Sequence, residues 1–202
     1  ILNDIILNVK KIFRKNYIIV DNFYNTSYIK SLNYNKYFDK FTSKVFLDIG
    51  LNKTSLFFYN LNNLIHSNFI PIGGNHITKD ISKMLNYDLQ ESEQIKLKLK
   101  QNNLTFLNDN NSKDILIKIV HARIEEIIDL SFKNLNHIKM LKDFKSVLVF
   151  SGEGSKLLSK NSIYLREDYN YFDDMSFFEE NSDLVCESAY NYNVSDLVNE
   201  VV

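Results

Sequence analysis

The sequence predicts an α/β fold in which helices pack against a sheet. Three runs rich in β-branched and aromatic residues, Lys44–Asp48, Leu56–Tyr59 and Leu64–Ile70, are joined by short turns and predict a meander of three strands. A fourth run, Val147–Phe150, predicts a buried strand that leads straight into a glycine-containing loop. Between them, Ile115–Leu135 repeats apolar residues at helical spacing and predicts the longest helix.

The first forty residues predict a helix, a short strand and a second helix. Apolar residues recur at helical spacing from Leu2 to Phe13, and Tyr17–Val20 is a short run typical of a strand. Asn25–Ser27 can cap a helix that runs to about Leu32.

Pro71 and the pair Gly73 and Gly74 end the meander, and helices are expected around Ile77–Leu85 and over Ser92–Lys100. The polar stretch Asn102–Asp114 predicts a loop around a short strand, Leu104–Leu107, and Ser182–Tyr190 predicts a last helix.

Composition excludes several classes of function. The chain has 202 residues, with 24 Lys and Arg against 25 Asp and Glu, so no overall positive charge attracts it to nucleic acid. A single cysteine, Cys186, excludes a disulfide framework and is expected to be a buried small residue. Because the chain starts at Ile1 in what already resembles the middle of a domain, we expect it to be a piece of a longer protein.

Two loops after predicted strands could bind phosphate or sugar: Asp48–Thr54 and Ser151–Ser155. Glycine lets backbone N–H groups approach an anion, and an adjacent Asp can hold Mg²⁺ through water. The plain alternatives are a hairpin turn for the first loop and a strand-to-helix turn for the second. No Walker A loop, nucleophile elbow or dinucleotide fingerprint is present in the sequence.

The remaining polar candidates are weaker. His66, His76, His121 and His137 lack the spacing of a metal site and are expected at the surface or half-buried. Glu93 and Lys96 lie one helical turn apart, and the plain interpretation is a solvated ion pair.

Five segments, in this order, resemble the second half of the bacterial actin-like cell-division family FtsA. They are "VFLDIGLNKTSLFFY", "FIPIGGNHITKDISKML", "ESEQIK", "HARIEEII" and "VLVFSGEGSKL". The resemblance implies an actin-like, ribonuclease H-like lobe with a five-stranded mixed sheet, formed by residues 1–72 and 145–202. It also implies a smaller inserted α+β subdomain over residues 73–144, and it leaves the N-terminal lobe of the family outside this chain.

In that family ATP, with Mg²⁺, lies between two lobes, and the resemblance implies a role for matching residues. Asp48 would meet Mg²⁺ through water, and the other members of the implied nucleotide site are Gly50, Asn52, Thr54, Gly73, Gly74, Glu93, Lys96, Gly152 and Gly154. The usual "DIGGGTT" is "DIGLNKT" here, so Leu51 and Asn52 replace glycines. A Cβ at these positions is expected to crowd the phosphates, at a cost of ~1 kcal/mol or more per strained residue, and to weaken or abolish nucleotide binding.

The resemblance also implies partners. FtsA-like proteins polymerise and hold the C-terminal tail of FtsZ on the smaller subdomain, where Arg123 and Glu126 match a family pattern. The plain alternative is that both are solvated helix residues. The family works on the cytoplasmic side of the membrane at the division site and is anchored there by an amphipathic C-terminal helix, a pattern that Asp196–Val202 does not show.

Three other interpretations stay open. The PilM family of the type IV pilus platform has similar glycine and "E-x-x-K" motifs. A sugar-kinase-like or Hsp70-like ATPase is a second alternative, although the sequence offers no catalytic base in a recognisable motif and slow or absent ATP hydrolysis is expected. The third is an actin-like module that no longer binds nucleotide.

Overall fold

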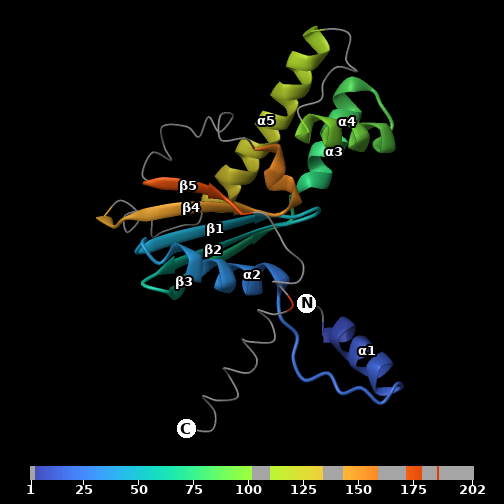
Figure 1. Cartoon of the computed structure of the whole chain (residues 1–202). Helices are drawn as coiled ribbons and strands as arrows, with labels where there is room; N and C mark the ends of the chain where they lie inside the picture. Colours follow the sequence, from blue (N-terminus) through green and yellow to red (C-terminus); the bar gives the residue numbers. More distant parts are fainter. Residues whose placement is uncertain (1–2, 102–109, 134–142, 159–171, 179–185, 187–202) are drawn as a thin grey trace. The chain divides into compact units, whose positions relative to one another are not determined.

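The computed structural model describes residues 3–101, 110–133, 143–158 and 172–178, together with Cys186. Figure 1 shows the arrangement of the elements. In chain order they are α1 (Asn3–Arg14), α2 (Thr26–Asn35), the 3₁₀ helix η1 (Lys36–Phe38), β1 (Ser43–Ile49), β2 (Thr54–Asn60), β3 (Asn63–Ile70), α3 (Gly74–Leu85), α4 (Leu89–Lys100), α5 (Asn110–Phe132), β4 (Ser146–Ser151), the 3₁₀ helix η2 (Glu153–Leu157) and β5 (Asp174–Phe177).

Contacts divide the chain into two compact units, residues 1–33 with 182–202 and residues 34–181. The second unit contains the sheet, α3, α4, α5 and both 3₁₀ helices. This division follows compactness alone, so the smaller subdomain expected over 73–144 stays a prediction.

The sheet has five strands in the order β3-β2-β1-β4-β5. The pairs β1–β2 and β2–β3 are antiparallel, whereas β1–β4 and β4–β5 are parallel, which makes the sheet mixed. In the register, Val45 of β1 lies opposite Phe58 of β2 and Leu148 of β4. The predicted meander and the predicted strand at 147–150 are therefore confirmed in one sheet.

Both faces of the central strands are buried. Every residue of β1 and β4 is buried, as expected for strands with continuous apolar runs. Val45, Leu47 and Ile49 belong to the core cluster that also contains residues of α3, α4 and α5. Phe46 points to the other face, where its ring contacts those of Tyr34 and Tyr59.

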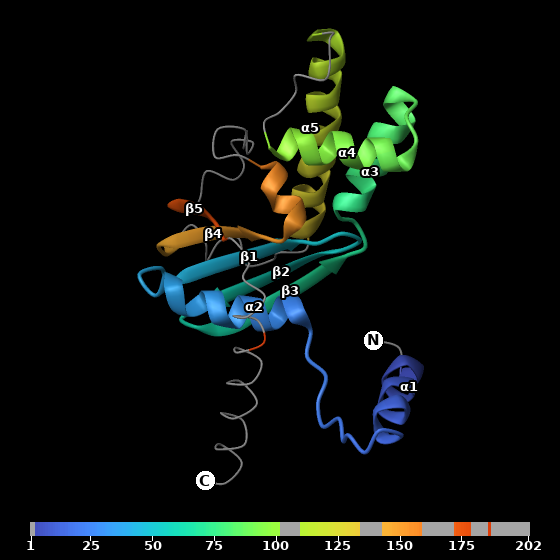
Figure 2. The same cartoon turned by 45° about the vertical axis from the view of Figure 1, so that its right-hand side comes forward.

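The helices α3, α4 and α5 lie together on one side of the sheet, as Figure 2 shows. Asp88 caps α4 by accepting a hydrogen bond from the backbone N–H of Glu91 at 2.7 Å. The side chain of Asn68 on β3 donates to the carbonyl of Ser131 at 3.0 Å and ties the end of α5 to the sheet. The prediction of a loop that continues to Asp114 is wrong from residue 110 onward, because α5 begins there. The predicted strand at 104–107 lies outside the described residues.

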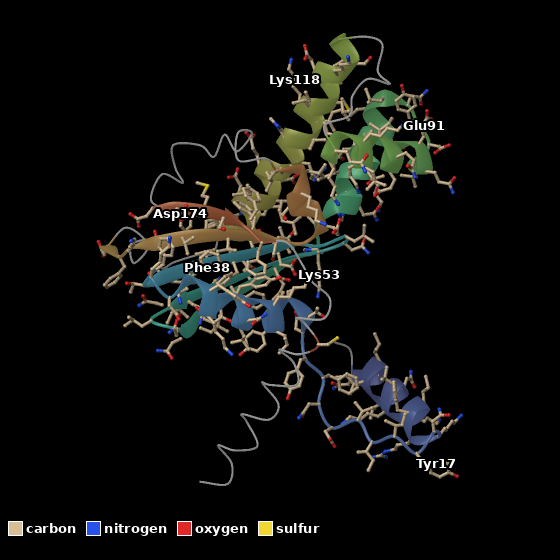
Figure 3. All side chains as sticks on the ribbon, in the orientation of Figure 1. Tyr17, Phe38, Lys53, Glu91, Lys118 and Asp174 are labelled. Atoms are coloured by element: carbon tan, nitrogen blue, oxygen red, sulfur yellow. The ribbon has the colours of Figure 1, made fainter. Side chains whose placement is uncertain are left out.

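Two expectations for the first and last segments are wrong. Tyr17–Val20 forms no strand, because Tyr17 adopts a positive φ of 59° and its N–H bonds back to the carbonyl of Arg14 at the end of α1. The Tyr17 side chain is 99% exposed (Figure 3). Cys186 is exposed rather than buried. The rest of the helix predicted at 182–190 lies outside the described residues, as does Asp196–Val202.

The five glycines of the chain allow close backbone packing at the ends of β1 and β4. A Cβ on Gly73 would clash with the carbonyl oxygens of Gly50 and Leu51, and a Cβ on Gly154 would lie 2.5 Å from Cγ2 of Ile49. Gly152 also has a φ of +86°, a left-handed conformation that favours glycine. These positions therefore require glycine for the loops to approach each other.

The turn between β1 and β2 is docked on the start of α3. The backbone N–H of Gly74 donates to the carbonyl of Gly50 at 2.9 Å, and that of Asn75 donates to the carbonyl of Leu51 at 2.7 Å. Lys53 lies in the same turn (Figure 3), and its carbonyl accepts from the N–H of Gly50 at 3.0 Å. These bonds fix α3 relative to the end of β1.

We expect Gly154→Ala to lower the free energy of unfolding by about 1–3 kcal/mol, because its methyl group would overlap Ile49. Gly74→Ala is the matched control, since a Cβ there meets its nearest atom at 3.7 Å and alanine suits a helix. The control is expected to change stability by less than about 1 kcal/mol. Urea denaturation measures both, and equal losses would contradict the packing described.

Candidate functional site: a glycine-lined cavity

A cavity of about 310 Å³ lies where the turn after β1, the start of α3, α4 and η2 come together. Glycine forms part of its lining, and charged groups of α4 and η2 form another part. Its residues are Gly50, Leu51, Gly74, Glu93, Lys96, Leu97, Lys100, Glu153, Gly154 and Leu157.

The structure brings half of the predicted nucleotide-site residues to this cavity. Gly50, Gly74, Glu93, Lys96 and Gly154 line it. The remaining five, which are close in the fold without lining the cavity, are Asp48, Asn52, Thr54, Gly73 and Gly152.

The polar members of the second group contact protein atoms. The hydroxyl of Thr54 donates to the carbonyl of Ile72 at 2.8 Å, and the amide oxygen of Asn52 accepts from the side chain of Asn75 at 3.1 Å. Asp48 is 7% exposed, and its carboxylate lies against the backbone of Gly152. Neither Leu51 nor Asn52 has a positive φ, so the backbone conformation does not require glycine at these positions. The expected crowding of phosphates by their side chains stays a prediction.

Lys96 is a buried cation that holds α4 against α3. Its ammonium donates to the carbonyl of Gly74 at 3.1 Å, to the hydroxyl of Thr78 at 2.7 Å and to the carboxylate of Glu93 at 2.6 Å. An ammonium has three protons, so these bonds use its donors. The interpretation of Glu93 and Lys96 as a solvated pair is wrong for Lys96, which is 7% exposed.

Glu93 remains charged at neutral pH although it is partly buried. Burial raises its pKa, but hydrogen bonds from Lys96 and Thr78, together with the positive charges of Lys96 and Lys100, outweigh that effect and hold the pKa below its ordinary value. One carboxylate oxygen accepts both of those bonds. Glu93 therefore presents a negative charge at the cavity.

A second carboxylate of the cavity was not found by sequence reasoning. Glu153 accepts hydrogen bonds from Lys100 of α4 and from Lys156 of η2. The bonds from Lys100 and Lys156 lower the pKa of Glu153. Two features of the sequence could have indicated this group. Glu153 lies between two glycines, and Lys100 lies one helical turn after Lys96.

Arg123 and Glu126 lie on α5 and do not line the cavity, and Arg123 joins α5 to α3. The guanidinium of Arg123 forms a two-point contact with the carboxylate of Asp80, at 2.6 and 3.0 Å, and also bonds Glu126. The hydrogen bond to Asp80 raises the pKa of Arg123. Spacing along the chain could not indicate the contact with Asp80, because the two residues are 43 positions apart.

The described residues hold no cluster of three or more His, Cys, Asp or Glu side chains that could bind a metal ion. His76 accepts a hydrogen bond from the N–H of Gly73 through Nδ1, and His137 lies outside the described residues. Of the helices that the structure describes, none combines the length and the apolar character needed to cross a membrane.

Comparison with known proteins gives a family. The family model described as cell division protein FtsA matches residues 45–199. FtsA of Buchnera aphidicola subsp. Baizongia pistaciae is 29% identical over 99 residues, covering 42% of this chain and 24% of that protein. FtsA of Helicobacter pylori is 27% identical over 91 residues, covering 45% of this chain and 18% of that protein. The matches thus span about a quarter or less of these relatives.

Solved structures give the fold. MreB5 of Spiroplasma citri bound to ADP has a TM-score of 0.66 at 12% identity, covering 98% of this chain and 68% of that one. The PilM–PilN type IV pilus biogenesis complex has a TM-score of 0.61 at 15% identity, covering 90% of this chain and 53% of that one. At such identities the likeness concerns the fold alone. The chain belongs to the FtsA family of cell-division proteins and has an actin-like fold with a mixed five-stranded sheet.

Proposed function

We propose that the protein is an FtsA-like division scaffold that binds ATP in the glycine-lined cavity, polymerises, and links FtsZ to the cytoplasmic membrane at the division site. The observation that carries the ATP site is the convergence of Gly50, Gly74 and Gly154 with Glu93 and Lys96 on one cavity. Small residues let a ligand approach the backbone closely, and the charged groups can orient it.

The cavity residues suit the sugar and base of a nucleotide. A side chain on Gly74 would extend into this space, because a Cβ there would lie 3.8 Å from Nζ of Lys96 and 3.9 Å from Cα of Gly154. The charged carboxylate of Glu93 can accept hydrogen bonds from ribose hydroxyls. Lys96 acts as a positioning residue, since its donors are taken by protein groups.

Mg²⁺ would reach this site with the phosphates of ATP, which supply most of its ligands. Asp48 would contact it through water. We expect ATP binding to favour the polymer-forming state, with slow or absent hydrolysis.

We expect Gly74→Leu to raise the Kd for Mg-ATP about tenfold or more, because the new side chain would occupy the cavity. Lys79→Leu is the control: it adds the same side chain to an exposed position of the same helix and should leave the Kd unchanged. Calorimetric titration measures the Kd, and circular dichroism checks that both variants fold. Equal Kd values for Mg-ATP in the two variants would contradict binding of ATP in this cavity.

The competing candidate is a module without nucleotide, and one observation favours it. The N–H groups of Gly74 and Asn75, at the start of α3, already donate to carbonyls of Gly50 and Leu51. Absence of Mg-ATP binding by the unaltered protein would support this candidate. The double variant Leu51→Gly with Asn52→Gly should then gain affinity.

The second binding role that we propose concerns the C-terminal tail of FtsZ, at Arg123 and Glu126. Their side chains are 23% and 47% exposed, so both can reach a peptide. Charged groups at a peptide site set orientation and association rate. Because Arg123 also binds Asp80, its loss could act through the packing of α3 on α5, and the test must separate these effects.

We expect Arg123→Ala and Glu126→Ala each to weaken binding of an FtsZ C-terminal peptide about tenfold in calorimetric titration. Asp80→Asn is the matched control, because it removes the ion pair between α3 and α5 and one of its two hydrogen-bond acceptors but keeps the Arg123 cation. If Asp80→Asn weakens binding as much as Arg123→Ala does, the direct role of Arg123 is wrong. Binding to the N-terminal peptide of a PilM partner, with none to the FtsZ peptide, would replace the proposal by a pilus role.

A further inference from the structure

An ion pair crosses from α4 to η2 beside the cavity. Lys100 is the last residue of α4, Glu153 is the first residue of η2, and their charged groups are in direct contact. Both residues line the cavity. We call this contact the Lys100–Glu153 bridge.

Each end of the bridge rests on backbone that other contacts hold in place. Glu153 lies between Gly152 and Gly154, both of which pack closely on Ile49. Lys100 lies one turn after Lys96, whose hydrogen bonds fix α4 to α3. A pair between preorganised elements loses less conformational entropy than a pair between flexible ones.

We propose that the Lys100–Glu153 bridge is a clasp that holds α4 against η2 and thereby slows the release of a nucleotide from the cavity. The proposal rests on the ATP site proposed above and assigns it a regulatory contact. Because residues of both α4 and η2 line the cavity, separating these two elements widens it, and that separation breaks the bridge. The effect is modest, because Glu153 is 63% exposed and salt screens such a pair.

Lys156 provides a matched control within the same cluster. It contacts the other carboxylate oxygen of Glu153, but it lies on η2 itself and does not line the cavity. Lys156→Met therefore removes one positive charge from Glu153, as Lys100→Met does, and leaves the link between α4 and η2 intact. A difference in nucleotide release rate between these two variants therefore reports the link between α4 and η2, and not the loss of a positive charge beside Glu153.

The test is the release rate of ATP labelled with N-methylanthraniloyl on the ribose, chased with excess ATP in a stopped-flow instrument. Lys100→Met and Glu153→Gln should release it about two- to fivefold faster than the unaltered protein, as expected for loss of a partly exposed pair. Lys156→Met should release it at the unaltered rate. Equal rates in Lys100→Met and Lys156→Met would overturn the clasp.

Amide hydrogen exchange of the nucleotide-free protein tests the link between α4 and η2 independently of ATP binding. Exchange in α4 and η2 should be faster in Lys100→Met than in Lys156→Met, because only the first variant separates the two elements. If the unaltered protein binds no unlabelled Mg-ATP in calorimetric titration, the proposed function fails and the expected effect on nucleotide release no longer applies. Faster exchange would then still support the link between α4 and η2, and unchanged exchange would overturn that link too.

Discussion

The arrangement of the cavity depends on close backbone approach at the ends of β1 and β4. Side chains at Gly73, Gly152 and Gly154 would overlap the backbone or side chains of residues 48–51. Without these glycines, the turn after β1 could not dock on α3 and η2 could not rest on Ile49. A chain of 202 residues with only five glycines places all of them at this one junction, which indicates a steric requirement rather than a general loop composition.

Charged side chains then fix the helices around this junction. Lys96 joins α4 to α3, and Arg123 joins α5 to α3 through Asp80. Breaking such a contact on one side leaves a partly buried charge unsatisfied, so loss of either partner is expected to destabilise this arrangement of the three helices. The charged residues that the resemblance implied as ligand contacts are thus first of all packing contacts. A bound ligand would meet an arrangement that is already formed.

Local pattern predicted most of the fold and part of the site. The meander, α3, α4 and the two glycine loops follow from periodicity and turn residues, which short stretches of sequence carry. Tyr17–Val20 has the composition of a strand. A strand also needs a neighbouring strand to pair with through backbone hydrogen bonds, and local composition does not reveal whether one is present. The burial of Lys96 and the contacts of Glu153 and Asp80 arise between segments that are distant in the chain, so spacing within one helix could not reveal them.

The turn that carries "DIGLNKT" lies at one end of the proposed nucleotide site. The carbonyls of Gly50 and Leu51 take the N–H groups of Gly74 and Asn75, which are the donors that a helix N-terminus would offer to phosphate. Glu93 and Lys96 of α4 line the cavity at the other end. On the proposed function, affinity would come mainly from sugar and base contacts and less from phosphate contacts. Such a site would discriminate weakly between ATP and ADP, and contacts at the α4 and η2 side of the cavity would control how long a nucleotide stays bound.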